Sequence, residues 1–239
     1  MALWNPWRGC HKFSDGCRFC YIHKGDAKRN VNTSDIVKTT NFDAPIQKNK
    51  TGAHKMKPNQ RVYVCFSTDF LLEDADIWRA DCWKMIAQRK DLEFLFLTKR
   101  IHRFMDCIPE DWGQDGYENV IVGCTIENQV EADKRLPIFS ELPIHHKIII
   151  CQPLLTELHI EPYLKDIEQI VVGGESDHNA RPLYYDWILS LRQQALAAGV
   201  PSFELRQLGT HFVKDGKHYC LKTRELTSQA KKAAINFHH

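Results

Sequence analysis

Short apolar runs alternate with longer stretches in which apolar residues recur at helical spacing, from about residue 62 to residue 205. The apolar runs predict buried strands and the longer stretches predict amphipathic helices. Strands that are apolar throughout are typical of a parallel sheet with helices on both faces. We expect strands at 62–66, 94–97, 120–124, 147–151, 170–172 and 202–205, and helices at 74–89, 101–107, 128–139, 154–164 and 184–198.

The first 61 residues lack this alternation. Pro6 and Gly9 interrupt regular structure, so residues 3–20 are expected to form at most a short strand that leads into a loop. Residues 22–38 are expected to continue as a helix. Residues 38–61 combine proline and glycine with six lysine or arginine residues and show no apolar periodicity. They predict a basic loop, which is either a solvated connection or a lid that contacts a polyanion.

Two α/β architectures fit the pattern of strands and helices. A doubly wound dinucleotide fold would carry G-x-G-x-x-G after its first strand, and this chain does not. Polar residues follow nearly every predicted strand, and in a (β/α) barrel such strand ends converge on one site. We therefore predict a partial (β/α)6-type barrel of parallel strands, as one domain over residues 1–239 with a loop at about 8–22 and the basic loop at about 38–61.

Composition narrows the class of protein further. A chain of 239 residues with 43% hydrophobic and 26% charged residues can bury a substantial core. The net charge of +2 is too small to indicate nucleic-acid binding by itself. No apolar run is long enough to cross a bilayer, and the N-terminus has no apolar signal core. Nine cysteines is an odd number, which does not favour a disulfide framework, so we expect a reducing compartment, the cytoplasm.

Three of the cysteines lie within eleven residues: Cys10, Cys17 and Cys20. Thiolates so closely spaced suit either zinc or an iron–sulfur cluster. Together with His23, the three cysteines could form a Cys₃His ligand set for zinc. The ligands of structural zinc sites, however, usually lie in the sequence as two close pairs. A [4Fe–4S] cluster held by three cysteines keeps one iron open to a further ligand. The spacing alone leaves both metals open.

The segment Trp4-Asn5-Pro6-Trp7-Arg8-Gly9-Cys10 and the cysteines after it resemble the N-terminus of a phage and bacterial family of unknown function that has a three-cysteine motif. That family in turn resembles radical S-adenosylmethionine enzymes, in which an aromatic residue precedes the last cysteine, as Phe19 does here. Similar blocks follow over nearly the whole chain, and they favour iron–sulfur over zinc: Leu97–Arg100, Ile126–Gln129, Pro153–Leu155, Gly173–Ser176 and Ala180–Pro182.

The resemblance implies a cofactor set and a reaction type. Cys10, Cys17 and Cys20 would hold a [4Fe–4S] cluster, and its open iron would bind S-adenosylmethionine. An electron donor would reduce the cluster, and the cofactor would then yield a 5′-deoxyadenosyl radical. In such enzymes a strand end like Gly173-Gly174-Glu175 binds the methionine amino group, and the resemblance points to Arg181 for the methionine carboxylate.

Other strand ends offer further candidates. Thr125, Glu127 and Asn128 are predicted to accept hydrogen bonds from the ribose of the cofactor. Lys99 and Arg100 end an apolar strand and predict contact with an anion, such as a carboxylate or phosphate. Asp69 is a candidate for substrate contact or proton transfer. Each of these side chains could instead cap a strand or a helix.

Two positions depart from the resembled family, and rival functions remain open. Gln152 stands where relatives tend to have glutamate, and Arg206 where they tend to have lysine, so neither is expected to transfer protons. The substrate is not readable, although a nucleotide or a nucleic acid fits the basic residues. The alternatives are a zinc-stabilised nucleic-acid-binding protein and a degenerate barrel that acts as a binding subunit.

Overall fold

The computed structural model describes residues 2–239, and these residues form a mixed α/β fold. The chain divides into two compact units, which are described separately below. Unit 1 consists of Met1–Lys12, Ile22–Gly123 and Leu142–His146, and unit 2 of Phe13–Tyr21, Cys124–Glu141 and Lys147–His239.

A large sheet of eight strands is the main element of the fold. β1 pairs with β4, β4 with β5, β7 with β8 and β8 with β10, all in parallel, whereas β13 pairs with β10 antiparallel. The order is β1 (Ala2–Trp4), β4 (Gln60–Val64), β5 (Leu92–Thr98), β6 (Val120–Thr125), β7 (His146–Cys151), β8 (Ile167–Gly173), β10 (Ser202–Gln207) and β13 (Phe237–His238).

The six predicted strands are confirmed, and they lie in chain order in the sheet. β1, at one end of the sheet, agrees with the short strand expected near the start of residues 3–20, whereas β13, at the other end, was not predicted. The mostly parallel α/β sheet is therefore established, and the curvature of a partial barrel stays a prediction. None of the helices within residues 2–239 has the length and apolar character needed to cross a membrane.

Unit 1 carries the helices α1 (Tyr21–Lys28, most of which lies in this unit), α2 (Asp76–Gln88) and α3 (Phe104–Cys107). The predicted helix over 22–38 is wrong beyond Lys28. Asn30 has a φ of 55°, which is outside the helical region, and the Asn32 side chain accepts a hydrogen bond from the Ser34 amide as in a turn. The chain then forms β3 (Val37–Lys38), which pairs with β2 (Trp7–Arg8).

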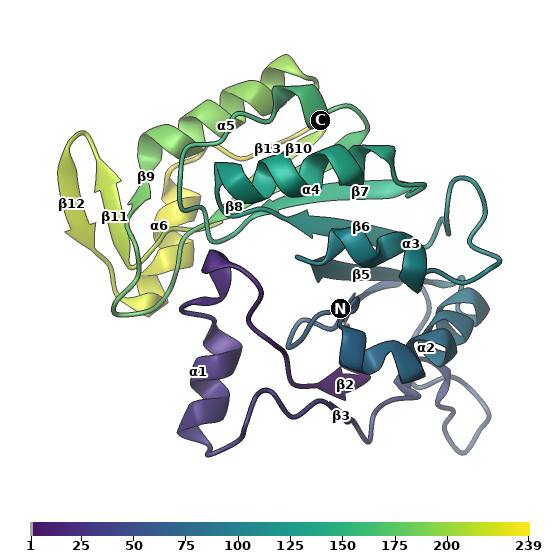
Figure 1. Cartoon of the computed structure of the whole chain (residues 1–239). Helices are drawn as coiled ribbons and strands as arrows, with labels where there is room; N and C mark the ends of the chain where they lie inside the picture. Colours follow the sequence, from purple (N-terminus) through teal and green to yellow (C-terminus); the bar gives the residue numbers. More distant parts are fainter. Residues whose placement is uncertain (1) are drawn as a thin grey trace. The chain divides into compact units, whose positions relative to one another are not determined.

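Unit 2 carries α4 (Gln129–Glu141), α5 (Tyr185–Ala197) and α6 (Leu226–Lys232). The predicted helix over 154–164 is wrong, because only Glu161–Tyr163 forms a 3₁₀ turn. The Leu154 and Leu155 amides donate instead to the carbonyls of Gly173 and Glu127, at 2.8 Å each. A second sheet, seen with α6 in Figure 1, consists of β9 (Leu183–Tyr184), β11 (His211–Lys214) and β12 (Lys217–Cys220).

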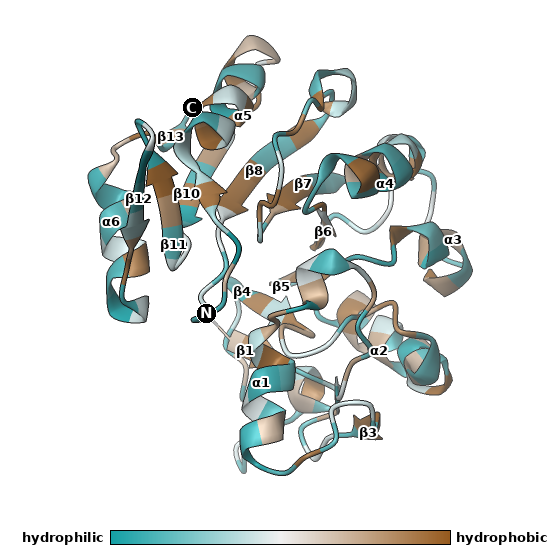
Figure 2. Ribbon diagram, turned by 60° about the vertical axis from the view of Figure 1, so that its left-hand side comes forward, coloured by the Kyte–Doolittle hydropathy of each residue, from teal (hydrophilic) through white to brown (hydrophobic). Residues whose placement is uncertain are grey.

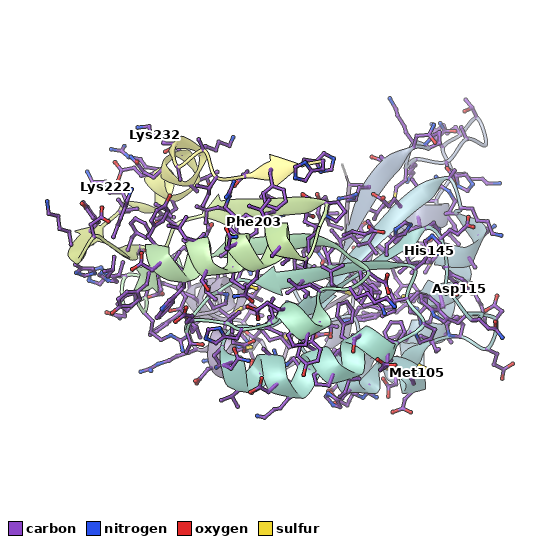
Figure 3. All side chains as sticks on the ribbon, turned by 90° about the horizontal axis from the view of Figure 1, so that it is seen from above. Met105, Asp115, His145, Phe203, Lys222 and Lys232 are labelled. Atoms are coloured by element: carbon purple, nitrogen blue, oxygen red, sulfur yellow. The ribbon has the colours of Figure 1, made fainter. Side chains whose placement is uncertain are left out.

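Each unit has its own apolar interior. In unit 1, Trp83 lies edge-on to Phe70 and to Trp112, with ring centroids 5.0 Å and 5.2 Å apart. In unit 2 the strands β7 and β8 carry mostly hydrophobic residues (Figure 2), and β10 adds the buried Phe203 and Leu205. Figure 3 shows Phe203 of β10 within the body of unit 2, whereas the exposed Lys222 and Lys232 lie at its edge.

The basic segment 38–61 is anchored in unit 1. Arg89, at the end of α2, is buried and donates hydrogen bonds to the carbonyls of Pro45 and Met56. The Arg61 guanidinium pairs with Glu93 on β5, and this hydrogen bond raises the pKa of Arg61. The remaining lysines of the segment are exposed: Lys38, Lys48, Lys50, Lys55 and Lys57.

Candidate functional site

The loop at residues 13–21, in unit 2, carries Cys17 and Cys20 in a tight series of turns. The Cys17 amide donates to the Ser14 carbonyl at 2.9 Å, and the Cys20 amide donates to the Cys17 carbonyl at 3.4 Å. Asp15–Cys17 forms a 3₁₀ turn. Both thiols are free and half-buried. We call residues 13–21 the cysteine loop.

Glu127, which follows β6, holds the cysteine loop. Its carboxylate is completely buried and accepts hydrogen bonds from the Ser14 hydroxyl and from the Gly16 amide, the latter at 3.2 Å. The other carboxylate oxygen pairs with Arg135 of α4 at 2.7 Å. Arg135 also donates to the Thr125 carbonyl at 2.6 Å. A charged pair buried in this way is stable because each partner is satisfied by several groups.

Gly16 allows this close contact between the loop and Glu127. A Cβ atom at position 16 would lie 3.0 Å from Oε1 and 3.1 Å from Cδ of Glu127. A residue with a side chain here would require Glu127 or the loop to move by a few tenths of an ångström. Glycine therefore suits this close contact, and the loop lies directly against the end of β6.

Arg181 connects the same loop to the segment that follows β8. Its guanidinium donates to the Asp15 carbonyl at 2.9 Å and lies 5.7 Å from the centre of the Phe19 ring. Glu175 accepts hydrogen bonds from the Arg181 amide and Nε at 2.9 Å and 3.1 Å, and also pairs with its Nη2. Two residues predicted to bind the cofactor separately are therefore paired with each other.

The glycine pair after β8 is packed against other parts of unit 2. A Cβ on Gly174 would lie 2.5 Å from the Gly209 backbone, and one on Gly173 would lie 2.8 Å from the Gln152 side chain. The Gly174 carbonyl accepts a hydrogen bond from the Gln207 side chain at 2.9 Å. These glycines therefore permit close packing against the Gly209 backbone and the Gln152 side chain.

The two other predicted ribose contacts lie at the end of β6. Thr125 is its last residue and is buried. The Asn128 side chain accepts a hydrogen bond from the Glu131 amide at 2.9 Å, which is the geometry of a helix N-cap. Asn128 thus starts α4 and fixes the direction in which that helix leaves the strand.

In unit 1, Asp69 is the centre of a buried network at the ends of β4 and β5. Its carboxylate accepts hydrogen bonds from the Leu71 amide at 2.9 Å and the Thr98 hydroxyl at 2.8 Å. Lys99 donates its amide at 3.2 Å, and Arg100 pairs with the carboxylate at 3.2 Å. Asp69 and Arg100 are 5% and 4% exposed, so this pair stabilises the strand ends rather than facing solvent.

Cys10 lies in unit 1, and its neighbours are attached to these strand ends. The Arg100 guanidinium donates to the His11 carbonyl at 3.2 Å, and the Thr68 hydroxyl donates to the Gly9 carbonyl. The Cys10 amide donates to the Thr33 carbonyl at 2.7 Å. The backbone on both sides of Cys10 is therefore fixed, while its thiol is half-buried.

The three cysteines are thus divided between the two units, with Cys10 in unit 1 and Cys17 and Cys20 in unit 2. Across residues 2–239, no group of three or more His, Cys, Asp or Glu side chains is arranged to hold a metal ion. The ligand set Cys10, Cys17 and Cys20 therefore stays a prediction.

The sequence interpretation missed the residues that hold the cysteine loop. Arg135 gave a signal, because it lies between Ala132 and Leu136 on the apolar side of α4, where a charge needs a buried partner. Ser14 and Gly16 gave none, since both are common in surface loops.

The comparisons with known proteins gave one match. A family model described as "Protein of unknown function (DUF5131)" matches residues 1–236. No curated protein and no solved structure matches the chain.

Proposed function

The chain belongs to the DUF5131 family of proteins of unknown function, and we propose that it is a radical S-adenosylmethionine enzyme with a [4Fe–4S] cluster on Cys10, Cys17 and Cys20. The observation that carries the proposal is the attachment of the cysteine loop to Glu127 and Arg181, which follow the parallel-sheet strands β6 and β8. Active sites of (β/α) proteins lie at these strand ends.

Unit 1 supports the proposal independently. Thr68 and Arg100, which follow β4 and β5, donate to the backbone on either side of Cys10. Each unit therefore attaches its cysteine segment to the carboxyl ends of its own strands. The six strands from β4 to β10 that lie in chain order suit the partial barrel of such enzymes.

The chemistry of the thiols fits an iron–sulfur cluster. Thiolates are the ligands, and burial raises the pKa of the thiols of Cys65, Cys82, Cys107 and Cys151, which keeps these four protonated. Cys10, Cys17 and Cys20 are instead half-buried. The odd number of cysteines does not favour a disulfide framework and suits a reducing compartment such as the cytoplasm.

When bound and reduced by an electron donor, the cluster and S-adenosylmethionine supply a 5′-deoxyadenosyl radical that abstracts hydrogen from the substrate. The protein's own residues position this site. Glu127 and Arg181 fix the cysteine loop, and Asp69 orients Arg100, which holds the His11 carbonyl. Because the Asp69 carboxylate already accepts hydrogen bonds from four groups, we assign it a positioning role instead of proton transfer.

Anaerobic reconstitution tests the proposal. We expect the wild-type protein to bind about four irons, the content of one cubane, and to release 5′-deoxyadenosine from S-adenosylmethionine under reduction. Cys10→Ala, Cys17→Ala and Cys20→Ala should each lose the iron, because two thiolates do not retain a cubane stably. Cys220→Ala, at an exposed cysteine, is the matched control and should retain it.

Two results would overturn this assignment. One is unchanged iron content in any of the three cysteine variants. The other is a wild-type protein that takes up one zinc ion and no iron, which would favour the zinc-stabilised alternative.

A further inference from the structure

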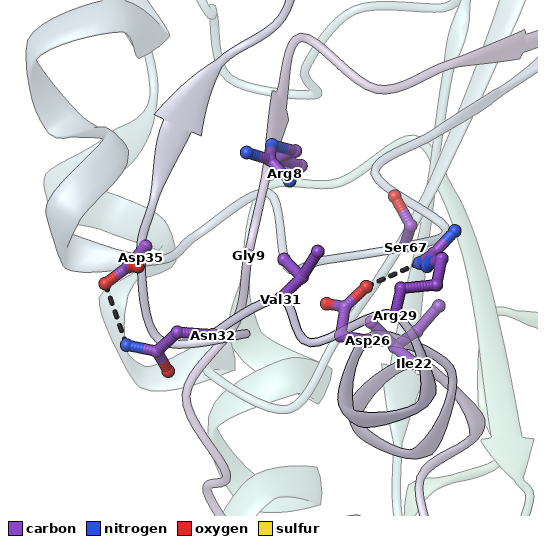
Figure 4. A pocket seen from close by; sticks show the side chains of 9 residues that line it. All are labelled: Arg8, Gly9, Ile22, Asp26, Arg29, Val31, Asn32, Asp35 and Ser67. Carbon is purple, nitrogen blue, oxygen red and sulfur yellow. Dashed lines mark hydrogen bonds and ion pairs between the residues drawn. The ribbon is translucent and has the colours of Figure 1, made fainter.

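Unit 1 contains a pocket of about 300 Å³ that is lined by residues of the segments 8–9 and 22–35 and by Ser67 (Figure 4). This volume is at the lower end of the range for small-molecule sites. Gly9, one residue before Cys10, forms part of its wall together with Ile22 and Val31. The polar lining consists of Arg8, Asp26, Arg29, Asn32, Asp35 and Ser67.

The segments that form the wall of the pocket are closely packed against each other. Gly9 has a φ of +93°, and a Cβ there would lie 2.5 Å from the Asp35 carbonyl oxygen. The Cys10 amide donates to the Thr33 carbonyl at 2.7 Å, so the segment 31–35 lies directly against residues 9 and 10. A ligand in this pocket would therefore be held next to a predicted cluster ligand.

The charges in the pocket are unequally satisfied. The Asp26 side chain, only 12% exposed, pairs with Arg29 at 2.5 Å, and Asp35 accepts a hydrogen bond from Asn32 at 2.9 Å. The Arg29 side chain is 70% exposed, so most of its guanidinium edge faces solvent. Within residues 2–239 the Arg8 side chain forms no hydrogen bond or ion pair, and it is exposed at the pocket.

We propose that this pocket binds the oxyanion of a small organic substrate, a phosphate or a carboxylate. Arg8 contacts the oxyanion, because a guanidinium presents paired donors to either group, and the open edge of Arg29 and the Ser67 hydroxyl assist. Asn32 and Asp35 provide acceptors for a hydroxyl or amino group elsewhere on the same molecule. The role as a substrate site rests on the proposed function, whereas anion binding itself does not.

This pocket changes where the anion of the substrate is expected. Lys99 and Arg100 were predicted to meet it, but Arg100 is buried against Asp69. Arg8 is exposed and lies two residues before Cys10, which is where a substrate has to be held if hydrogen is to be abstracted from it.

Calorimetric titration of the full-length protein at about 0.15 M salt, where surface charges are screened, tests the proposal. The probes are uridine 5′-monophosphate, malate and, as the uncharged control, uridine. Binding of the monophosphate identifies a phosphate site and binding of malate a carboxylate site. Failure of both probes to bind more tightly than about 10 mM overturns the proposal, as does equal binding of uridine.

Substitutions localise the binding. Arg8→Gln should lower the affinity for the probe about tenfold, since a charge-assisted hydrogen bond is lost. Lys28→Gln, at an exposed basic residue of α1 outside the pocket lining, is the matched control and should change the affinity less than about twofold. Equal effects of the two substitutions, or no effect of Arg8→Gln, would mean that the anion binds elsewhere.

A variant without the cluster separates this proposal from the proposed function. Cys17→Ala lies in unit 2 and is expected to lose the iron, yet it should bind the probe as the wild type does, because the pocket is formed by unit 1. Probe binding in a protein that never takes up iron would support the anion site and reject the radical enzyme. Loss of probe binding in Cys17→Ala would instead show that the pocket residues alone do not form the site, and would overturn the proposal.

Discussion

At the scale of single residues, Glu127 has the most demanding environment in unit 2. A carboxylate with no exposed surface is stable only when its charge is balanced and its oxygens are hydrogen-bonded. Arg135 supplies the charge, and Ser14 and Gly16 supply two of the hydrogen bonds. Glu127 therefore both pairs with Arg135 of α4 and fixes the position of the cysteine loop.

Glu127→Gln removes the charge that Arg135 faces and should lower the free energy of unfolding by about 3 kcal/mol. Because the loop contacts weaken, hydrogen exchange measured by mass spectrometry should become faster at residues 13–21. Glu131→Gln is the matched control, since Glu131 pairs with the same arginine on α4 but has no hydrogen bond to the loop. It should cost about 0.5 kcal/mol and leave exchange in the loop unchanged. Equal exchange at residues 13–21 in both variants would contradict the role of Glu127.

At the scale of elements, the strands and helices that could be predicted are those whose buried residues produce a regular apolar pattern in the sequence. β5 and β6 are apolar along nearly their whole length because both of their faces are covered, and their positions were predicted correctly. β2, β3 and β13 are two residues long, too short to show any alternation. Residues 154–160 have apolar positions at helical spacing, yet the Leu154 and Leu155 amides bond to the carbonyls of Gly173 and Glu127 at the strand ends. Tertiary hydrogen bonds of this kind are invisible in a single sequence.

The helix α1 contributes a pH-dependent term to stability through Asp26. Burial alone would raise the pKa of this carboxyl, but hydrogen bonds from Arg29 and Thr33 and the charges of Arg29 and Arg8 outweigh it. The pKa of Asp26 in the folded protein therefore lies below its ordinary value of 3.8. A lowered carboxyl pKa stabilises the fold above the unfolded value, and this contribution is lost as the pH falls through the folded value.

Asp26→Asn should accordingly lower the free energy of unfolding by about 1 to 2 kcal/mol at neutral pH. The difference from the wild type should shrink once the pH falls below about 3.8, as denaturant titrations at a series of pH values would show. His23, whose own pKa is lowered mainly by burial, also senses the charge of Asp26 and should be followed in the same series. Asp81→Asn, which breaks only an exposed pair with Lys84, should change stability by less than about 0.5 kcal/mol. A difference that persists unchanged into strong acid would mean that Asp26 acts through its shape and not its charge.

At the scale of the whole molecule, the positions of the polar residues at the strand ends could be predicted from the sequence, but their interactions could not. The residues that follow β4, β5, β6 and β8 do lie at strand ends, as the apolar runs before them required. Their partners could not be predicted: Glu175 pairs with Arg181, Asp69 with Arg100, and Glu127 with Arg135. A strand pattern shows which end a side chain occupies, but the partner comes from a distant part of the chain that no local period reveals.

The whole molecule should respond to S-adenosylmethionine only when the cluster is in place, because the proposed open iron is one of the cofactor's ligands. A ligand that binds the folded state alone stabilises it by about 2.7 kcal/mol at 100 times its dissociation constant. For a chain of this length that corresponds to a rise in Tm of roughly 5 to 10 °C. Anaerobic calorimetry of the reconstituted protein should show this shift, and Cys17→Ala, which cannot retain the cluster, should show none. An equal shift in both proteins would place the cofactor away from the cluster, and no shift in the iron-loaded wild type would reject S-adenosylmethionine as its ligand.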